Sequence, residues 1–238
     1  MNTRTILITG GAKRIGKHLV EFLAQQNHTI ALHYNTSEQE AIDISKKYKN
    51  VHIFKCDLSD INQVQTMFND IKQKLQHVDV LINNASYFCN DDIYTLDEKS
   101  FDIHMNINLK APLFLCLKFF ESFKYNNIHG IIINIIDQRI NQSHTDYISY
   151  TLSKSTLWTL TQNLALALAP HIRVNGIAPG PVLSNIYQTQ QDFIDEYHNI
   201  PLKAKVCIKD LCNAVKFLIE TSSITGQLLF VDGGQHLS

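Results

Sequence analysis

The chain has 238 residues, of which 45% are hydrophobic and 18% charged, and its formal net charge is -1. This apolar content is enough to bury one substantial core, so we expect a single domain of the α/β class spanning residues 1–238. The 21 basic residues are scattered along the chain, which argues against nucleic-acid and membrane-surface partners. No run reaches the roughly 20 apolar residues of a membrane helix. The amino terminus lacks the pattern of a signal peptide, so we expect a cytoplasmic protein.

Cysteine and histidine usage points to neither disulfides nor a metal. The five cysteines include no Cys-x-x-Cys pair, and we expect them to be reduced thiols packed as small side chains. The 11 histidines show no spacing typical of ligands, so no metal site is expected.

A glycine turn near the amino terminus is the first candidate site. Residues 5–9 read as a short apolar strand, and the turn after it leads into a helix with apolar positions at helical spacing. Glycines let the backbone turn tightly and approach a ligand, and a helix end offers unpaired N–H groups and partial positive charge. The turn therefore predicts an anion site. Its candidate residues are Gly10, Lys13, Arg14, Ile15 and Gly16, with Arg14 standing where the usual dinucleotide fingerprint has a glycine.

The end of the second predicted strand, residues 29–34, bears on the choice of cofactor. An acidic residue there would bind a ribose 2′-hydroxyl and repel a 2′-phosphate. The residues present are His33, Tyr34, Asn35 and Ser37, and none is acidic. With Lys13 and Arg14 nearby on the glycine turn, this pattern favours NADP over NAD.

Strands and helices then alternate, with helices predicted at residues 37–49 and 61–75 and strands at 51–55 and 78–82. This alternation predicts a Rossmann fold, a doubly wound parallel sheet with helices on both faces and ligands at the carboxyl ends of the strands. The candidates at these ends are Asp57, Leu58, Asn84, Ala85 and Ser86, with Phe88 in the loop that follows. Asp57 suits an acceptor for an adenine amino group, and it suits a helix cap equally well.

A long helix is predicted at residues 106–126, and its segment 112–120 is apolar nearly all round. One apolar stripe would be enough to pack on the sheet. The surplus predicts a second buried face, covered either by a partner subunit or by deep burial in a single chain. Asn108 lies inside this helix, where asparagine is a poor helix former, and it suggests a kink or a water-binding role.

The stretch from residue 131 to residue 154 carries the predicted chemistry. Residues 131–136 read as a buried strand that ends at Asp137, and residues 147–169 read as a helix with Tyr150 and Lys154 on one face. A phenol with a pKa of about 10 is a poor proton donor or acceptor near neutrality unless a cation stabilises its anion. Lys154 is placed to be that cation. Three titratable groups in one cleft suit a proton transfer coupled to another step.

The remainder of the chain completes the predicted domain. A strand at residues 172–178 stops at Pro179 and Gly180, which also fall at the carboxyl edge. Residues 182–201 are polar, aromatic and aperiodic, as in a substrate flap, although an ordinary solvent loop has the same character. A helix is predicted at 207–221 and a strand at 227–231, and no repeat or linker divides the chain.

Taken together, these motifs resemble the short-chain dehydrogenase/reductase family over essentially the whole chain. The resemblance rests on Thr9-Gly10-x-x-x-x-Ile15-Gly16, Asn83-Asn84-Ala85, Asn108, Tyr150-x-x-x-Lys154 and Pro179-Gly180, in this order. It implies a tyrosine proton donor, a lysine that also holds the nicotinamide ribose, an asparagine that supports a water chain, and commonly a homotetramer.

Two departures from the family pattern narrow the resemblance. Asp137 replaces the family's usual serine, and Arg14 replaces a glycine of the first turn. Both are similar to the pteridine reductase and dihydromonapterin reductase branch, as are Phe88 two residues after Ser86 and the sequence near the end of the chain. An arginine that some members carry near the cofactor phosphate is Thr36 here, which bears on the strength of the NADP preference.

This resemblance gives the functional hypothesis. We expect NADPH-dependent reduction of a dihydropterin (dihydromonapterin, dihydrobiopterin or dihydrofolate), with the ring stacked between nicotinamide and Phe88. Tyr150 and Asp137 would form the proton relay, Lys154 would lower the pKa of Tyr150, and Arg14 and Ser86 would help to hold pterin and cofactor phosphates. One alternative is a ketone or 3-oxoacyl thioester reductase on the same scaffold. Another is a non-catalytic NADP-binding sensor.

Overall fold

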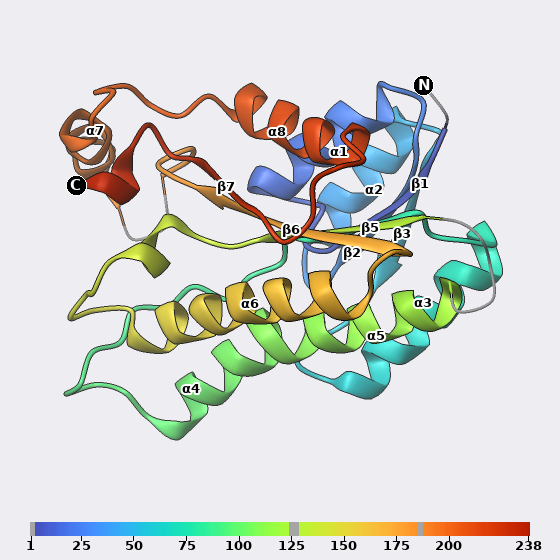
Figure 1. The fold of residues 1–238 in the computed structure, drawn as a ribbon, viewed down its shortest axis with the longest axis horizontal. Helices are drawn as coiled ribbons and strands as arrows, with labels where there is room; N and C mark the ends of the chain where they lie inside the picture. The colour runs from blue at the N-terminus through green and yellow to red at the C-terminus, as the bar shows by residue number, and fades with distance from the viewer. Residues whose placement is uncertain (1–2, 124–128, 185–187) are drawn as a thin grey trace.

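The computed structural model describes residues 3–123, 129–184 and 188–238 of the chain (Figure 1). Its centre is a seven-stranded sheet with the strand order β3-β2-β1-β4-β5-β6-β7, in which every neighbouring pair is parallel. The strands are β1 (Thr5–Ile8), β2 (Thr29–Tyr34), β3 (Val51–Lys55), β4 (Val80–Asn83), β5 (Gly130–Ile135), β6 (Ile172–Pro179) and β7 (Leu228–Val231). The Rossmann-type doubly wound sheet expected from the sequence is confirmed.

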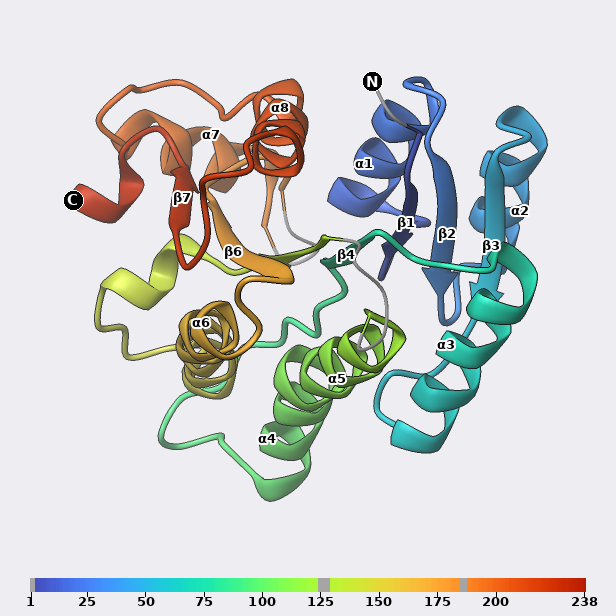
Figure 2. The ribbon, with the colours of Figure 1, turned by 45° about the vertical axis from the view of Figure 1, so that its right-hand side comes forward.

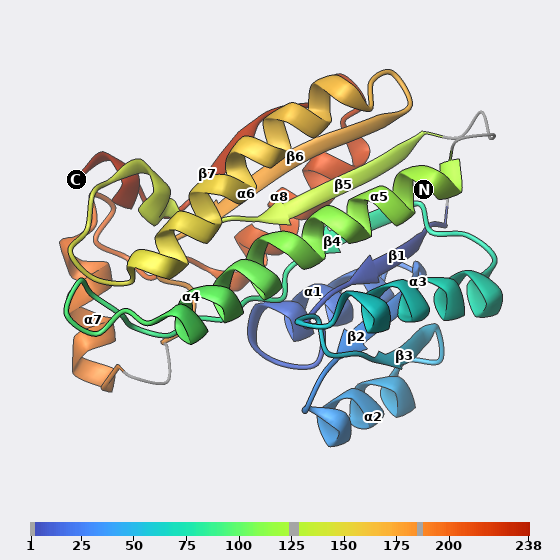
Figure 3. The same cartoon turned by 90° about the horizontal axis from the view of Figure 1, so that it is seen from below.

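Helices cover both faces of this sheet (Figure 2). They are α1 (Arg14–Ala24), α2 (Glu38–Lys47), α3 (Ile61–Leu75), α4 (Glu98–Met105), α5 (Ala111–Phe123), α6 (Ile148–Ala167), α7 (Gln190–Asn199) and α8 (Ile208–Glu220). Helices α1, α2 and α8 pack on one face, and α3, α5 and α6 pack on the other, the face seen in Figure 3.

The strand sequences explain this two-sided core. Successive side chains of a strand point to opposite faces, so a strand buried on both faces must be apolar throughout. In β1, Ile6 and Ile8 belong to the core under α1 and α8, whereas Leu7 belongs to the core under α3 and α5. All three side chains are fully buried. The continuous apolar runs of the sequence therefore become central strands with a core on each side.

The predicted helix over residues 106–126 is wrong in its start and in its regularity. The helical segment begins earlier, as α4, and it passes through a π-helical turn, η1 (Asn106–Lys110), before continuing as α5. Residues 124–126 of the predicted helix lie outside the described residues. The π turn contains Asn108, the poor helix former whose presence suggested a kink, and such turns often lie at functional sites.

The predicted flap over residues 182–201 contains a helix, α7. Its start is set by a capping box in which the Thr189 hydroxyl accepts from the backbone N–H of Asp192, and the Asp192 carboxylate accepts from that of Thr189. Residues 185–187 of the flap lie outside the described residues. In the described parts of the chain, no helix has both the length and the apolarity that crossing a membrane would need.

Candidate active site

The carboxyl edge of the sheet borders a cavity of about 870 Å³. Because the strands are parallel, their carboxyl ends all lie at the same edge of the sheet. The segments that follow the strands therefore line the cavity in the order of the strands in the sheet. Residues after β3, β2 and β1 line one end, residues after β4 and β5 line the middle, and residues after β6 and β7 line the other end.

The glycine turn is held in shape by a buried histidine. The Nδ1 atom of His33 accepts from the backbone N–H of Gly10 (3.0 Å), and its Nε2 atom lies 3.0 Å from the carbonyl oxygen of Cys56. These partners place the single proton on Nε2. Burial lowers the pKa of His33 to about 4, so the ring is neutral near pH 7. His33 thus holds the glycine turn, the predicted anion site, in a fixed shape.

The loop after β4 is tied to the same turn. The side-chain amide of Asn84 donates to the carbonyl oxygens of Thr9 (2.8 Å) and Gly10 (3.2 Å), and the Thr9 hydroxyl accepts from the backbone N–H groups of Asn84 and Ala85. At Gly16, an added Cβ would lie 2.1 Å from the Gly10 carbonyl oxygen. Only glycine at this position lets α1 approach the turn so closely.

Asn108 supports the middle of the cavity from behind. Its side-chain oxygen accepts from the Ser86 hydroxyl (3.2 Å) and the Tyr87 N–H (2.7 Å), and its nitrogen donates to the Tyr87 carbonyl (2.9 Å) and the Ser153 hydroxyl (3.0 Å). These four contacts use the full hydrogen-bonding capacity of the amide. In this structure the side chain therefore joins the loop after β4 to α6, and the water chain stays a prediction.

Asp137, Tyr150 and Lys154 lie together at the carboxyl end of β5. The hydroxyl of Tyr150 donates to Asp137 Oδ2 (2.7 Å), and Asp137 Oδ1 accepts from the backbone N–H of Arg139 (2.9 Å). The ammonium of Lys154 donates to the carbonyl oxygen of Ile135 (2.8 Å) and lies 5.7 Å from the centre of the Tyr150 ring. The three titratable groups expected in one cleft are in place.

Burial governs the protonation of this trio. It raises the pKa of the Asp137 carboxyl, and it lowers the pKa of the Lys154 amine to about 8. The pKa of Tyr150 is raised well above its ordinary value, first by burial and then by the adjacent Asp137 charge. This direction is opposite to the lowering by Lys154 that the sequence suggested, because burial first and then the contacting Asp137 carboxylate raise the pKa of the phenol.

An aromatic wall closes the cavity beside the trio. The Phe88 ring stacks on the Tyr147 ring, with centroids 4.5 Å apart and planes at 14°, and it meets the Tyr150 ring edge-on at 4.7 Å. The Arg139 guanidinium lies 4.8 Å from the centre of the Tyr147 ring. Tyr147 has φ 53° and ψ 41°, a left-handed conformation that costs energy for a residue with a side chain. In this conformation, at the start of α6, its ring stacks on Phe88.

Most residues singled out from the sequence line the cavity. They are Gly10, Lys13, Arg14, Ile15, Gly16, His33, Asn35, Asp57, Leu58, Asn84, Ala85, Ser86, Phe88, Asp137, Tyr150, Lys154, Pro179 and Gly180. Asp57 does not cap α3, because that cap is Asp60; the Asp57 carboxylate instead accepts from the N–H and hydroxyl of Ser59.

Three predicted site residues lie outside the cavity wall: Tyr34, Ser37 and Asn108. Tyr34 is buried in the core, and its hydroxyl donates to Glu38 (3.4 Å), because the strand pleat points it away from the cavity side. Ser37 precedes the first turn of α2 and makes no capping hydrogen bond with its side chain.

Arg14 lines the cavity, but its guanidinium is engaged with the flap. It donates to the carbonyl oxygens of Ser184 (2.8 Å) and Leu183 (3.2 Å), and its backbone has a positive φ of 51°. Lys13 forms an ion pair with Glu40 (2.9 Å). The turn therefore contacts the segment after β6, a link that the sequence did not suggest.

Several residues of the cavity wall were not singled out individually from the sequence. They are Tyr87, Ile107, Ile135, Ile136, Gln138, Arg139, Tyr147, Pro181, Val182, Leu183, Gln188, Glu196 and Gln235. Gln138 and Arg139 directly follow β5, so the strand-end rule that selected Asp137 could have found them. Val182, Leu183, Gln188 and Glu196 fall within residues 182–201, the segment that the sequence predicted as a substrate flap, whereas Gln235 comes from the final turn η3 (Gln235–Leu237), which was not proposed as part of the wall.

Comparison with known proteins identifies the family. Residues 10–236 match the family model described as Enoyl-(Acyl carrier protein) reductase. The chain belongs to the short-chain dehydrogenase/reductase family. Over 240 residues it is 30% identical to the Uncharacterized oxidoreductase YjdA of Bacillus subtilis, which covers 96% of this chain and 95% of that protein.

Two further relatives bear on the activity of this short-chain dehydrogenase/reductase. The 3-oxoacyl-[acyl-carrier-protein] reductase FabG of Staphylococcus aureus is 28% identical, covering 99% of each chain. The crystal structure of FolM Alternative dihydrofolate reductase 1 from Brucella suis, in complex with NADP, superposes with a TM-score of 0.95 at 37% identity and covers 99% of this chain and 96% of that one. The family and the reductase scaffold are common to all of these proteins.

Proposed function

We propose that this protein catalyses the NADPH-dependent reduction of a dihydropterin to its tetrahydro form, with dihydromonapterin, dihydrobiopterin and dihydrofolate as the candidate substrates. The observation that carries the proposal is the partly buried Asp137 carboxyl that accepts the Tyr150 hydroxyl at 2.7 Å. The similarity to the NADP-bound FolM structure supports both the cofactor and the substrate class.

The residues at the β1 end of the cavity fit a dinucleotide. Helix α1 begins at Arg14, and no side chain caps it, so the N–H groups of its first turn are open toward the cavity wall for a phosphate. Gly10, with a positive φ of 63°, brings the backbone close to this point. Asn35, Asp57 and Leu58 would hold the adenosine end, and Lys154 the nicotinamide ribose. When bound, NADPH supplies the hydride.

The chemistry required of the protein is the delivery of a proton. Reducing a C=N bond needs a proton on the ring nitrogen as hydride reaches the neighbouring carbon. Tyr150 and Asp137 share one short hydrogen bond and both line the cavity, so they form a relay that holds this proton beside the reacting ring, directly or through a water. The Asp137 carboxyl can also accept from the amino and N–H groups of a pterin edge.

Charge balance favours a protonated Asp137 in the reacting state. If Tyr150 gave up its proton beside an ionised Asp137, two negative charges would remain in a buried site opposite the single charge of Lys154. If Asp137 starts protonated, the same transfer leaves one negative charge opposite Lys154. The pKa of Asp137, raised by burial, increases the population of this form.

Reduction of a 3-oxoacyl thioester is the second candidate function. It is favoured by the similarity to FabG, which extends over 99% of both chains, and by the description of the matching family model. A ketone needs a donor that steadies a developing alkoxide, and a serine hydroxyl does this without adding charge. A carboxyl at residue 137 suits that task less well, because it can donate only while it is protonated, whereas a hydroxyl donates at any pH near neutrality.

The test is oxidation of NADPH by the purified protein with dihydromonapterin, dihydrobiopterin, dihydrofolate and an acetoacetyl thioester in parallel. We expect turnover with the pterins only. The variant Asp137→Ser should lose about 100-fold or more in kcat/KM for pterins, with the dissociation constant for NADPH unchanged. Turnover with the thioester alone, or near-normal pterin turnover by the variant, would exclude the proposal; NADPH binding without any turnover would point to a sensor.

A further inference from the structure

At the β6 and β7 end of the cavity, three polar side chains from distant segments meet. The side-chain amide of Gln188 donates to one carboxylate oxygen of Glu196 (2.7 Å), and that of Gln235 donates to the other (3.3 Å). All three side chains line the cavity. We call Gln188, Glu196 and Gln235, together with Gln138 of the adjacent turn, the acceptor cluster. The two amides fix the carboxylate of Glu196 in one orientation.

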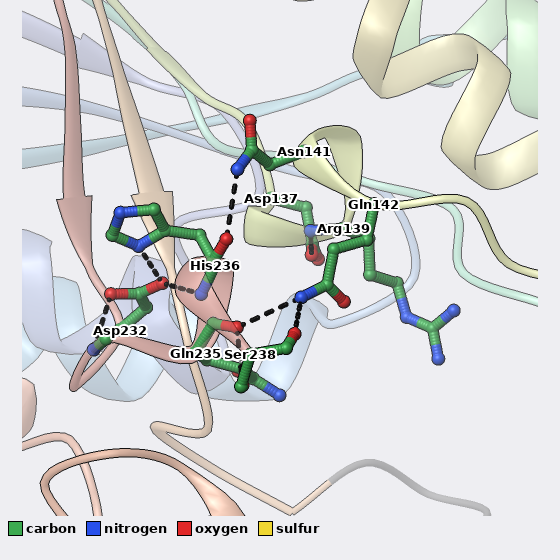
Figure 4. Close-up of polar contacts among 9 residues, drawn as sticks. Asp137, Arg139, Asn141, Gln142, Asp232, Gln235, His236 and Ser238 are labelled. Atoms are coloured by element: carbon green, nitrogen blue, oxygen red, sulfur yellow. Dashed lines mark hydrogen bonds and ion pairs between the residues drawn. The ribbon is translucent and has the colours of Figure 1, made fainter.

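The end of the chain holds this cluster in place (Figure 4). The side chains of Asn141 and Gln142 donate to the carbonyl oxygens of His236 (3.0 Å) and Gln235 (3.3 Å), so η3 is fastened to the turn η2 (Gln138–Asn141) that follows Asp137. On its other side, the Asp232 carboxylate accepts from the backbone N–H of His236 (2.8 Å). Gln235 therefore belongs to a braced segment of the cavity wall.

Two atoms of the cluster point to a ligand. The side-chain oxygens of Gln138 and Gln235 are buried, and neither has a hydrogen-bond partner within the described ranges of the chain. The Gln138 side chain is only 6% exposed, and both residues line the cavity. Buried acceptors are normally satisfied, so these oxygens call for donors supplied from the cavity.

The charges at this end disfavour an anionic group. The cations of the glycine turn are already engaged, since Lys13 is paired with Glu40 and the Arg14 guanidinium donates to the carbonyl oxygens of Ser184 and Leu183. The guanidinium of Arg139, which follows Gln138, is paired with Asp146 (3.2 Å) and lies over the Tyr147 ring. Glu196 adds a negative charge to a wall of amide oxygens. This surface offers acceptors to donors and repels carboxylates and phosphates.

We propose that the acceptor cluster is the specificity-determining subsite for the substrate's side chain, and that it selects a neutral side chain carrying several hydroxyl groups. The inference rests on the proposed reduction of a dihydropterin, and it names the substrate class within that reaction. Hydroxyl groups donate to Glu196 and to the free oxygens of Gln138 and Gln235. A folate-type tail, which ends in a carboxylate, is disfavoured at the same place.

The test compares three 7,8-dihydropterins that differ at position 6: a trihydroxypropyl, a methyl and a p-aminobenzoylglutamate substituent. The wild type should give the highest kcat/KM with the trihydroxypropyl substrate. Glu196→Ala should lower this value about tenfold through a higher KM, the effect of losing one or two hydrogen bonds. It should change kcat/KM for the methyl substrate less than about twofold. Glu196→Gln, which keeps the size of the side chain, should raise kcat/KM for the glutamate-tailed substrate.

Asp195→Ala is the matched control, because Asp195 is exposed on the same helix, accepts from Gln191 (2.8 Å) and does not line the cavity. This control should leave kcat/KM unchanged for all three substrates, and the NADPH dissociation constant should be the same in every variant. If Glu196→Ala lost kcat/KM equally for the methyl and trihydroxypropyl substrates, or for neither, the assignment of the subsite would be overturned while dihydropterin reduction stood. A wild type that reduces none of the three would overturn the proposed function as well.

Discussion

The carboxyl at residue 137 sets the protonation chemistry of this site. A serine in its place would add no titratable group, whereas Asp137 brings a partly buried acid into contact with Tyr150. Burial raises the pKa of Asp137 and of Tyr150 and lowers that of Lys154, so the site resists separated charges. The state that balances these charges is the one in which Asp137 is protonated.

This charge balance predicts that activity falls as pH rises. Asp137 is protonated below its raised pKa, so kcat/KM for the dihydropterin should decline as pH increases through that pKa, and it should decline further as Lys154, with a pKa of about 8, loses its charge. The check is a pH profile of kcat/KM between about 4.5 and 9, with Asp137→Asn as the comparison. The variant should lack the decline at lower pH, which belongs to Asp137, and should keep the decline that belongs to Lys154. A wild-type profile that rises with pH would contradict the proposed state of the carboxyl.

At the scale of elements, the catalytic helix is positioned by the loop that follows β4. The Asp91 carboxylate accepts from the backbone N–H of Ser149 (3.1 Å), its carbonyl accepts from Ile148 (3.4 Å), and Asn90 Oδ1 accepts from the N–H of Tyr147 (3.2 Å). These contacts satisfy N–H groups at the start of α6, and the negative charge of Asp91 suits the positive end of a helix. They fix the helix one to three residues before Tyr150.

Removing this clamp should weaken both the fold and the chemistry. Asp91 is only 2% exposed, so Asp91→Ala would leave the buried N–H of Ser149 unsatisfied, and we expect it to lower the free energy of unfolding by about 2 kcal/mol. It should also reduce kcat, because Tyr150 would lose its fixed position. Urea unfolding and steady-state kinetics measure the two effects. Asp91→Asn keeps an acceptor and should recover most of both; if the asparagine variant is as impaired as the alanine variant, the clamp is not the cause.

Elements were predictable where the local signal was complete. The bounds predicted for α3 and β3 are those observed, since α3 combines helical periodicity with an Asp60 cap that accepts from Asn62 and Gln63, and β3 lies between clear turns. The π turn at Asn108 was only hinted at, because its hydrogen bonds depend on the loop of Ser86 and Tyr87. Helix α7 was missed although its capping box, Thr189 and Asp192, is present in the sequence.

At the scale of the whole molecule, an apolar face on helices α5 and α6 remains exposed. Helices α5 and α6 form a groove of about 220 Å³ lined by Leu113, Phe114, Cys116, Leu117, Phe120, Leu164 and Leu168. Leu113 is 39% and Leu117 43% exposed, although the rest of α5 packs well. We propose that a second copy of the chain covers this face within a homotetramer, since the formal net charge of -1 gives copies little mutual repulsion.

The assembly can be tested by placing a charge in the groove. Leu117→Glu should shift the protein to smaller species in sizing with light scattering, because an unpaired carboxylate at an apolar interface is costly to desolvate. Lys72→Glu, on the exposed side of α3 away from the groove, is the matched control and should not change the assembly. A wild type that elutes as a monomer, or a Leu117→Glu variant with the wild-type mass, would refute the interface.

The sequence by itself determined the alternating architecture and the central trio. Apolar runs and helical periodicity are local properties, and parallel strands bring their carboxyl ends to one edge regardless of loop details, so Asp137, Tyr150 and Lys154 could be placed together in advance. Tertiary structure alone decided the direction of the Tyr150 pKa, the engagement of Arg14 with the flap and the assembly of the acceptor cluster. Burial depends on everything packed around a group. Contacts such as that between Glu196 and Gln235 join segments with no shared local pattern, and only the folded chain brings these segments together.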